Sequence, residues 1–238
     1  MPPITVMIKP VSGICNMRCK YCFYADVAKN RTNQTFGRMD YSTLKTLVQK
    51  VFDYAEEEVS FVFQGGEPTL AGLEFYKAFI DMQNKFNKKH ISVCNSIQTN
   101  GYNLDEKWAA FFRKHNFLVG LSMDGTKELH DSLRTDKTGK GTYTNVMKSV
   151  GLLEEHNVNF NIICVVTNFT ARHPKKVFTA LKKYRFLQFI PCIDDFSGEK
   201  KNYSLTNKRY ADFLCSTFDE YYRCIKQDNY VSVRNFDN

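Results

Sequence analysis

The stretch VSFVFQGGEP, residues 59–68, contains one of the short apolar runs that predict the fold of this chain. Its first half is a short run of β-branched and aromatic residues. Such a run is too apolar for a half-exposed strand and is typical of a parallel strand covered by helices. Two glycines and a proline follow within a few residues, and these residue types end a strand. The stretch therefore predicts a buried strand with a polar loop at its carboxyl end.

Five further apolar runs have the same character, and helical patterns separate them. We expect six strands in all, beginning near residues 4, 59, 91, 117, 160 and 185. In the clearest helix, apolar side chains recur at spacings of three and four, with Asp40 or Ser42 as the cap; these side chains are Leu44, Leu47, Val48, Val51, Phe52 and Ala55. Weaker helical patterns cover about 72–88, 104–115, 142–156, 172–184 and 206–226. This alternation predicts an α/β fold with a parallel sheet and right-handed crossovers.

Six strand–helix units are fewer than the eight of a complete barrel, so we expect a partial (β/α)6 barrel over residues 1–200. Residues 201–238 are expected to form a C-terminal helix and the truncated start of a following domain. In barrel-like sheets, chemistry gathers in the loops after the carboxyl ends of the strands. The unusual residues fall there: three cysteines after the first strand, then QGGEP, QTNG, SMDG, TNFT and PCIDD after the others. We expect these loops to meet at one rim.

Composition narrows the class of protein. The 238 residues are 43% hydrophobic and carry a formal net charge of +8. The basic residues occur as scattered pairs mixed with acidic ones, so a nucleic-acid footprint is disfavoured. No run approaches the roughly 18 apolar residues of a membrane helix, and the first ten residues lack the design of a signal peptide. We therefore expect a cytoplasmic protein with reduced thiols.

The segment GICNMRCKYCFY, residues 13–24, places three cysteines within eight residues. A disulfide is disfavoured in a reducing compartment, and a zinc site lacks a fourth ligand because the nearest histidine in sequence is His90. Three thiolates on a cube of four irons leave one iron open to bind a substrate or a cofactor. We therefore predict that Cys15, Cys19 and Cys22 hold one [4Fe-4S] cluster.

The spacing of these cysteines, with Tyr21 just before the third, resembles the radical S-adenosylmethionine superfamily, as do GGEP and the six strand–helix units. The segments CNMRCKYCFY, FQGGEPTL, SIQTNG, LSMDG, HDSLRTDKTGKGTY and QFIPC together look like the anaerobic sulfatase-maturating enzymes. The resemblance implies an oxidoreductase that converts a cysteine or serine side chain of a sulfatase to formylglycine through a 5′-deoxyadenosyl radical. It also implies S-adenosylmethionine as cofactor, a sulfatase or other peptide as substrate, and an electron donor such as flavodoxin or ferredoxin.

The resemblance also implies roles for single residues. The cofactor's amino group would meet the backbone of Gly66 and Glu67, where glycine removes the side-chain barrier. Its carboxylate would pair with Arg134, its ribose with Ser122, and its adenine with Tyr21 and Ile193. Tyr24 and Gln64 lie where the family meets its peptide substrate. Structural alternatives stay open: a surface arginine for Arg134, a turn-forming serine for Ser122, and packing for Tyr21 and Ile193.

The remaining cysteines and histidines predict no second site. Cys94, Cys164, Cys215 and Cys224 are expected to behave as small buried hydrophobes. Cys192 lies nearer the rim, and His130 is expected to be structural.

The sequence departs from the family pattern at its end. The resemblance implies a cysteine-rich C-terminal domain with two further clusters and a carboxylate proton acceptor, which is expected beyond Asn238. Three readings stay open: a piece or shortened form of a maturase, another radical S-adenosylmethionine peptide maturase, or a truncated non-catalytic iron–sulfur binding domain.

Overall fold

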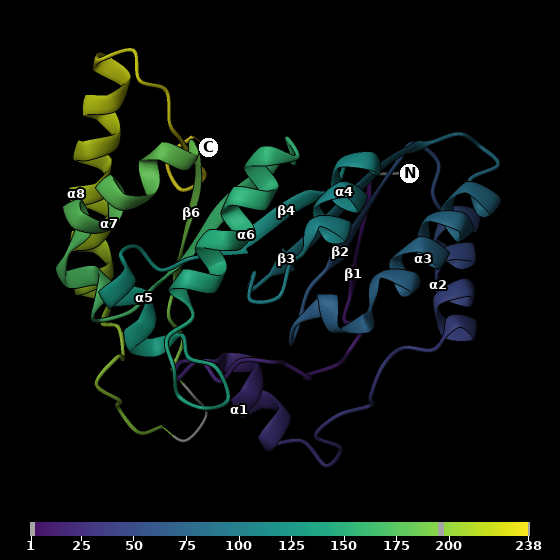
Figure 1. The fold of residues 1–238 in the computed structure, drawn as a ribbon, viewed down its shortest axis with the longest axis horizontal. Helices are drawn as coiled ribbons and strands as arrows, with labels where there is room; N and C mark the ends of the chain where they lie inside the picture. Colours follow the sequence, from purple (N-terminus) through teal and green to yellow (C-terminus); the bar gives the residue numbers. More distant parts are fainter. Residues whose placement is uncertain (1–2, 195–197, 238) are drawn as a thin grey trace.

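The computed structural model describes residues 3–194 and 198–237. Within these residues the core is a seven-stranded sheet in which all neighbouring strands run parallel and the strand order follows the chain (Figure 1). The first and last strands are not paired with each other, so the sheet stays open as a partial barrel. The strands are β1 (Ile4–Ile8), β2 (Glu58–Phe63), β3 (Ser92–Thr99), β4 (Leu118–Ser122), β5 (Phe160–Val166), β6 (Phe186–Pro191) and β7 (Ser232–Val233).

The helices between the strands follow the predicted pattern. They are α1 (Phe23–Lys29), α2 (Tyr41–Tyr54), α3 (Leu73–Phe86), α4 (Glu106–Lys114), α5 (Lys127–Leu133), α6 (Tyr143–Glu155), α7 (Pro174–Leu181) and α8 (Asn207–Lys226), with short 3-10 turns η1 (Pro68–Ala71), η2 (Thr170–Arg172) and η3 (Lys182–Tyr184). The six predicted strands are confirmed. The sequence reading missed β7, α1 and α5, because elements of two to seven residues are too short to show a clear period.

In helix α2, the sequence determines both the residue that caps the helix and the face that packs against the sheet. The Asp40 side chain accepts a hydrogen bond from the Thr43 backbone N–H at 2.7 Å, so Asp40 rather than Ser42 is the cap. The apolar stripe of α2 then packs against the sheet beside α3, where aromatic rings fill the core. The Phe63 ring of β2, for example, lies 4.8 Å from the Phe79 ring of α3, edge to face.

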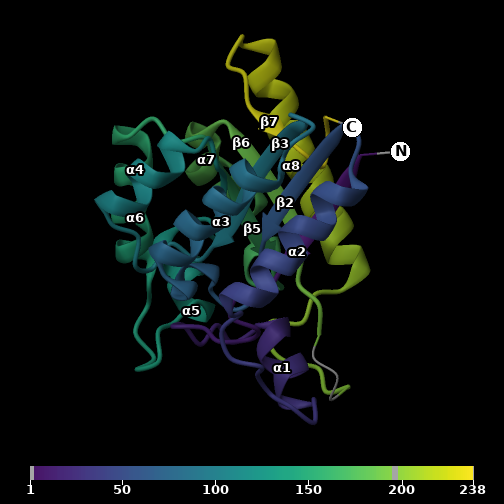
Figure 2. The same ribbon diagram turned by 90° about the vertical axis from the view of Figure 1, so that its right-hand side faces the viewer.

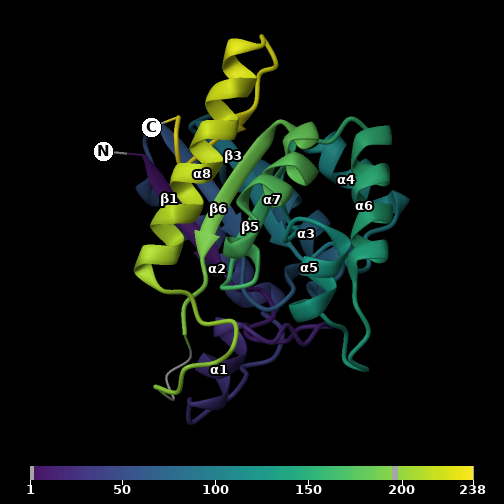
Figure 3. The ribbon, with the colours of Figure 1, turned by 90° about the vertical axis from the view of Figure 1, so that its left-hand side faces the viewer.

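The C-terminal residues pack onto the barrel. Helix α8 lies beside α7 (Figure 3), and its fully buried Phe213 ring is 5.2 Å from the Phe189 ring of β6. Strand β7 extends the sheet by pairing with β6. The domain boundary at residue 200 stays a prediction.

The carboxyl ends of the strands point toward α1 and its flanking loops, which project beyond the sheet (Figures 2 and 3). The loops with the unusual residues therefore lie at one end, as the sequence predicts. None of the helices in the described ranges has the length and apolar character that crossing a bilayer requires.

Candidate functional site

A cavity of about 390 Å³ opens at the carboxyl ends of the strands. Its walls come from the cysteine loop (residues 13–22), from the loops after β2 and β3, and from the ends of β4, β5 and β6. Ten of the predicted site residues line it: Cys15, Cys19, Tyr21, Cys22, Tyr24, Gln64, Gly66, Ser122, Arg134 and Ile193. Residues up to 178 positions apart in sequence thus share one cavity, while the role of each stays a prediction.

Gly66 brings the loop after β2 against the cysteine loop. Its φ is +59°, and a β-carbon at this position would stand 2.3 Å from the carbonyl oxygen of Ile14. The next residue, Glu67, donates its backbone N–H to that same oxygen at 2.9 Å. Only glycine allows this close approach with this backbone angle. Gly66 therefore positions the cysteine loop, whatever it contacts in a bound cofactor.

The Glu67 side chain does not line the cavity, since it is 1% exposed and turned into the protein. It accepts hydrogen bonds from the hydroxyls of Thr69 and Thr99 at 2.7 and 2.8 Å and from the Asn100 backbone N–H at 2.7 Å. Burial raises the pKa of the Glu67 carboxyl, and these hydrogen bonds oppose the shift. The side chain joins the loops after β2 and β3, a role that the sequence reading did not predict.

Two hydrogen-bond donors lie beside the Cys15 sulfur. The sulfur lies 3.4 Å from the Met17 backbone N–H and 3.6 Å from the Asn100 side-chain nitrogen. Burial raises the pKa of the Cys15 thiol, and these two donors oppose the shift. The Asn16 side-chain nitrogen is buried beside them without a partner among the described residues. The Asn16 side-chain nitrogen can therefore donate a hydrogen bond to a further acceptor.

The described residues contain no group of three His, Cys, Asp or Glu side chains close enough to hold one metal ion. Cys15, Cys19 and Cys22 nevertheless line the same cavity. The structure thus brings the three thiols to one cavity, and the cluster that they would hold stays a prediction.

Arg134 is 6% exposed, so it is not a surface arginine. Its Nε lies 2.8 Å from Oδ2 of Asp124, which also accepts a hydrogen bond from the Tyr21 hydroxyl. The other oxygen of Asp124 accepts the backbone N–H of Val165 in β5 at 2.9 Å. The guanidinium lies 5.5 Å from the centre of the Tyr21 ring. Asp124 thus connects the cysteine loop, β5 and Arg134, and burial raises the pKa of the Tyr21 hydroxyl.

Sequence reasoning missed Asp124 although it quoted the segment SMDG that contains it. An acidic residue in a loop carries no sign of its partner. The sequence offered one indication of the pairing: the loop that contains Asp124 and the loop that contains Arg134 were both expected at the rim.

His130 is fully buried and contacts residues on both sides of the Arg134 loop, so its expected structural role agrees with its contacts. Its Nδ1 accepts the Asp124 backbone N–H at 3.3 Å, and its Nε2 lies 3.0 Å from the Thr142 hydroxyl oxygen. The Thr142 hydroxyl in turn donates to the carbonyl oxygen of Arg134 at 3.1 Å. Burial and the nearby Arg134 charge lower the pKa of His130 from 6.5 to about 4, so the ring is neutral near pH 7.

The other predicted residues differ in exposure. Ser122 is 7% exposed at the end of β4, whereas Ile193 is 61% exposed at the mouth of the cavity. Tyr24 and Gln64 are brought together, because the Gln64 amide donates to the Tyr24 hydroxyl at 3.1 Å. The Lys9 ammonium lies 4.6 Å from the centre of the Tyr24 ring.

The cysteines outside the loop divide into two groups. Cys164, Cys192 and Cys224 are buried, and burial raises the pKa of the Cys192 thiol to about 12. Cys94 and Cys215 are exposed, which corrects the expectation that both are buried. Cys94 lies near the start of β3 beyond the well-covered part of that strand, and Cys215 lies on the outward side of α8. None of the eight cysteines, all of which the structure describes, forms a disulfide.

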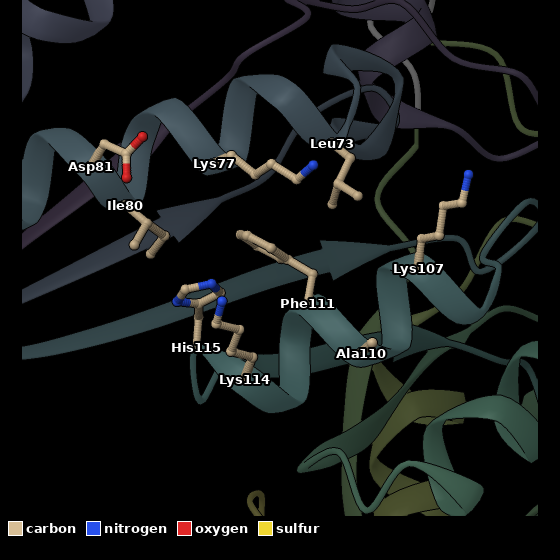
Figure 4. A pocket seen from close by; sticks show the side chains of 9 residues that line it. All are labelled: Leu73, Lys77, Ile80, Asp81, Lys107, Ala110, Phe111, Lys114 and His115. Atoms are coloured by element: carbon tan, nitrogen blue, oxygen red, sulfur yellow. The ribbon is translucent and has the colours of Figure 1, made fainter.

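A second cavity, of about 420 Å³, lies between α3 and α4 on the outside of the barrel (Figure 4). Three lysines, Lys77, Lys107 and Lys114, surround an apolar floor that includes the Phe111 ring. None of the predicted site residues lines this cavity.

Known proteins resemble this chain in sequence and in fold. The radical SAM superfamily model matches residues 10–181. Cysteine-type anaerobic sulfatase-maturating enzymes of Clostridium novyi and Clostridium perfringens (ATCC 13124) are 44% and 46% identical over the whole chain, which spans 64% and 65% of their lengths. The solved structure "Native anSMEcpe with bound AdoMet and Cp18Cys peptide" matches 99% of this chain and 64% of that one, with 45% identity and a TM-score of 0.93.

Superfamily members use a [4Fe-4S] cluster and S-adenosylmethionine, and the cysteine loop and the rim cavity of this chain fit both groups. The family match covers most of the chain, including every residue of the cysteine loop and the glycine loop. The chain therefore belongs to the radical SAM superfamily.

Proposed function

We propose that this chain binds a [4Fe-4S] cluster and S-adenosylmethionine and oxidises a cysteine side chain of a sulfatase to formylglycine. The observation that carries the proposal is the single cavity that collects three cysteines, Arg134 and Ser122 at the carboxyl ends of the strands. The identity of 44–46% to relatives described as cysteine-type supports cysteine as the target. Because the chain spans under two thirds of those relatives, the activity of a whole protein is part of this proposal.

The cysteine loop would hold the cluster through Cys15, Cys19 and Cys22. The N–H groups near Cys15 would donate to its sulfur once it is an iron-bound thiolate, and they offset part of the cost of burying that charge. Together, the cluster and S-adenosylmethionine supply one-electron chemistry able to remove a hydrogen atom from an unactivated C–H bond.

The remaining residues would bind and orient S-adenosylmethionine. Arg134 offers a buried cation to the carboxylate, and its bond to Asp124 fixes the plane of the guanidinium. Ser122 offers a hydroxyl to the ribose from the end of a strand. Tyr21 is held by its own bond to Asp124, so its ring is fixed for stacking on adenine opposite the exposed Ile193.

The peptide would enter beside Tyr24 and Gln64. Their mutual hydrogen bond leaves further donor and acceptor capacity for a peptide backbone. A peptide seated there would cover the cavity mouth and exclude water from the reacting carbon. The presence of a Cp18Cys peptide in the anSMEcpe structure supports a peptide substrate. A location in the cytoplasm is part of the same proposal.

One anaerobic reaction tests this function. Reconstituted protein is mixed with S-adenosylmethionine, dithionite and a sulfatase peptide containing Cys-x-Pro-x-Arg, and mass spectrometry follows both products. We expect about four irons per chain, release of 5′-deoxyadenosine and formylglycine in the peptide.

The matched controls are two cysteine variants. Replacing Cys15, Cys19 and Cys22 by alanine should abolish iron binding and 5′-deoxyadenosine release. Replacing the exposed Cys94 and Cys215 by alanine should change neither. Iron retained by the triple variant, or no 5′-deoxyadenosine from a fully clustered sample, would contradict the proposal.

A further inference from the structure

The cysteine loop borders two hollows, not one. Cys19 and Cys22 line the rim cavity and also an adjoining depression of about 200 Å³ on the side of α1. Lys20, Asp26 and Lys29 line this depression and do not line the rim cavity. A redox group held by these cysteines would therefore also be reached from the α1 side.

The segment that contains the cysteine loop and α1 is strongly basic. Residues 13–38 contain five Lys or Arg residues and one Asp, a formal charge of +4, which is half of the +8 of the whole chain. All five basic residues are exposed, and Lys20 is also held in place because its Nζ donates to the Ser132 carbonyl oxygen at 2.9 Å. A concentration of one charge sign beside a reducible centre favours the approach of a partner of opposite charge.

An apolar side chain stands in the same segment. Phe36 is 75% exposed, more than any other large hydrophobic residue that the structure describes. Its backbone N–H lies 3.4 Å from the Ser12 hydroxyl, next to the start of the cysteine loop. Exposed aromatic residues among Lys and Arg are typical anchors of protein–protein interfaces.

We propose that the α1 surface, defined as Arg18, Lys20, Lys29, Arg31 and Phe36, docks an acidic one-electron carrier protein. This inference rests on the proposed function, since it needs a cluster on the three cysteines. The carrier gives up one electron and the cluster accepts it, and no bond or proton is exchanged between the two proteins. The adjoining depression brings the carrier close to Cys19 and Cys22, which electron transfer requires because its rate falls steeply with distance.

Charge reversal tests the docking. The variant Lys29→Glu with Arg31→Glu changes the charge by −4 next to the depression and leaves the cysteine loop and the rim cavity unaltered. The control variant Lys107→Glu with Lys114→Glu makes the same change on α4, where Figure 4 shows both side chains. The probe is an acidic flavodoxin, whose binding to reconstituted protein is measured by calorimetry at low and high salt.

We expect the α1 variant to bind the flavodoxin about tenfold more weakly at low salt, and the difference to shrink as salt screens the charges. The α4 control should bind like the unmodified protein. Release of 5′-deoxyadenosine should fall about tenfold with reduced flavodoxin as donor and stay unchanged with dithionite, which needs no docking surface.

Three other outcomes would overturn either the docking surface or the proposed function. Equal flavodoxin affinity in the two variants would overturn the docking surface. Weaker binding of the sulfatase peptide by the α1 variant with dithionite would assign the surface to the substrate and also overturn the proposal. A reconstituted, unmodified protein that binds flavodoxin but releases no 5′-deoxyadenosine with dithionite would refute the proposed function and leave the docking result standing.

Discussion

At the scale of the residue, the Asp124 carboxylate organises the site. Its two oxygens serve Arg134, Tyr21 and the backbone of Val165, so one buried anion fixes groups from three parts of the chain. A buried charge is costly unless it is paired and hydrogen-bonded, and this carboxylate has both kinds of partner. Arg134 can serve two carboxylates because the guanidinium presents five donors in a rigid fork.

Arg134→Lys tests this division of donors. Lysine keeps the charge but has no planar fork, so it cannot hold Asp124 and a cofactor carboxylate in the same geometry. We expect S-adenosylmethionine to bind more weakly by about 1–3 kcal/mol, measured by calorimetry on reconstituted protein. The control is Arg113→Lys on the exposed side of α4, which should have no effect. An unchanged affinity in the Arg134 variant would leave Arg134 with a structural role only.

At the scale of the element, α5 and the loop after it place Arg134. The chain of contacts runs from the Asp124 backbone through the His130 ring and the Thr142 hydroxyl to the Arg134 carbonyl. Asp131 closes the same loop, because its side chain accepts the Tyr143 backbone N–H at 2.8 Å. The segment HDSLR is therefore a scaffold for its last residue.

The neutral His130 ring makes stability depend on pH. Its pKa is about 4 when folded and near 6.5 when unfolded, so acid protonates the unfolded chain first. The contribution to stability is complete above about pH 6.5 and is lost as the pH falls toward 4. Between pH 7.5 and 5.5 the loss should be about 1 kcal/mol.

Denaturant unfolding at these two pH values, compared with His130→Gln, measures this contribution. Glutamine has a donor and an acceptor but no charge change, so the variant should lose less stability than the unmodified protein over this range. Equal losses would show that groups other than His130 set the pH dependence. Asp124, Asp131, Lys127 and Arg134 surround the ring in both proteins, so their contribution cancels in the comparison.

At the scale of the whole molecule, residues 207–237 complete the hydrophobic core. Phe213, Val231 and Val233 are at most 1% exposed, and β7 covers the edge of β6. Burial of each such side chain contributes about 1.5–3 kcal/mol, and a typical domain has a total stability of only about 5–15 kcal/mol. A chain that ends at Thr206 should therefore show no cooperative unfolding transition in circular dichroism.

The control for this truncation is Tyr222→Ser, at a half-exposed position on α8, which should change stability by less than about 1 kcal/mol. A sharp transition in the truncated chain would instead make residues 201–238 a separate unit, as the predicted domain boundary has it.

Local patterns in the sequence predicted the six main strands, the long helices and ten of the residues that share the rim cavity. They could do so because burial of one face imposes a period on neighbouring residues, and because parallel strands carry the loops after them to the same end of the sheet. The spacing of Cys15, Cys19 and Cys22 and the glycine at position 66 are local features of the same kind.

How those residues are held depends on the packing of segments that are distant in sequence. The bond between Tyr21 and Asp124 joins residues 103 positions apart, and the bonds of Glu67 to Thr99 and Asn100 depend on the register of β2 against β3. The exposure of Cys94 and the pairing of β7 likewise depend on which helix or strand covers them. Local patterns state that a side chain is polar or apolar, but its partner is set by the packing of distant segments, and that packing exists only in the folded chain.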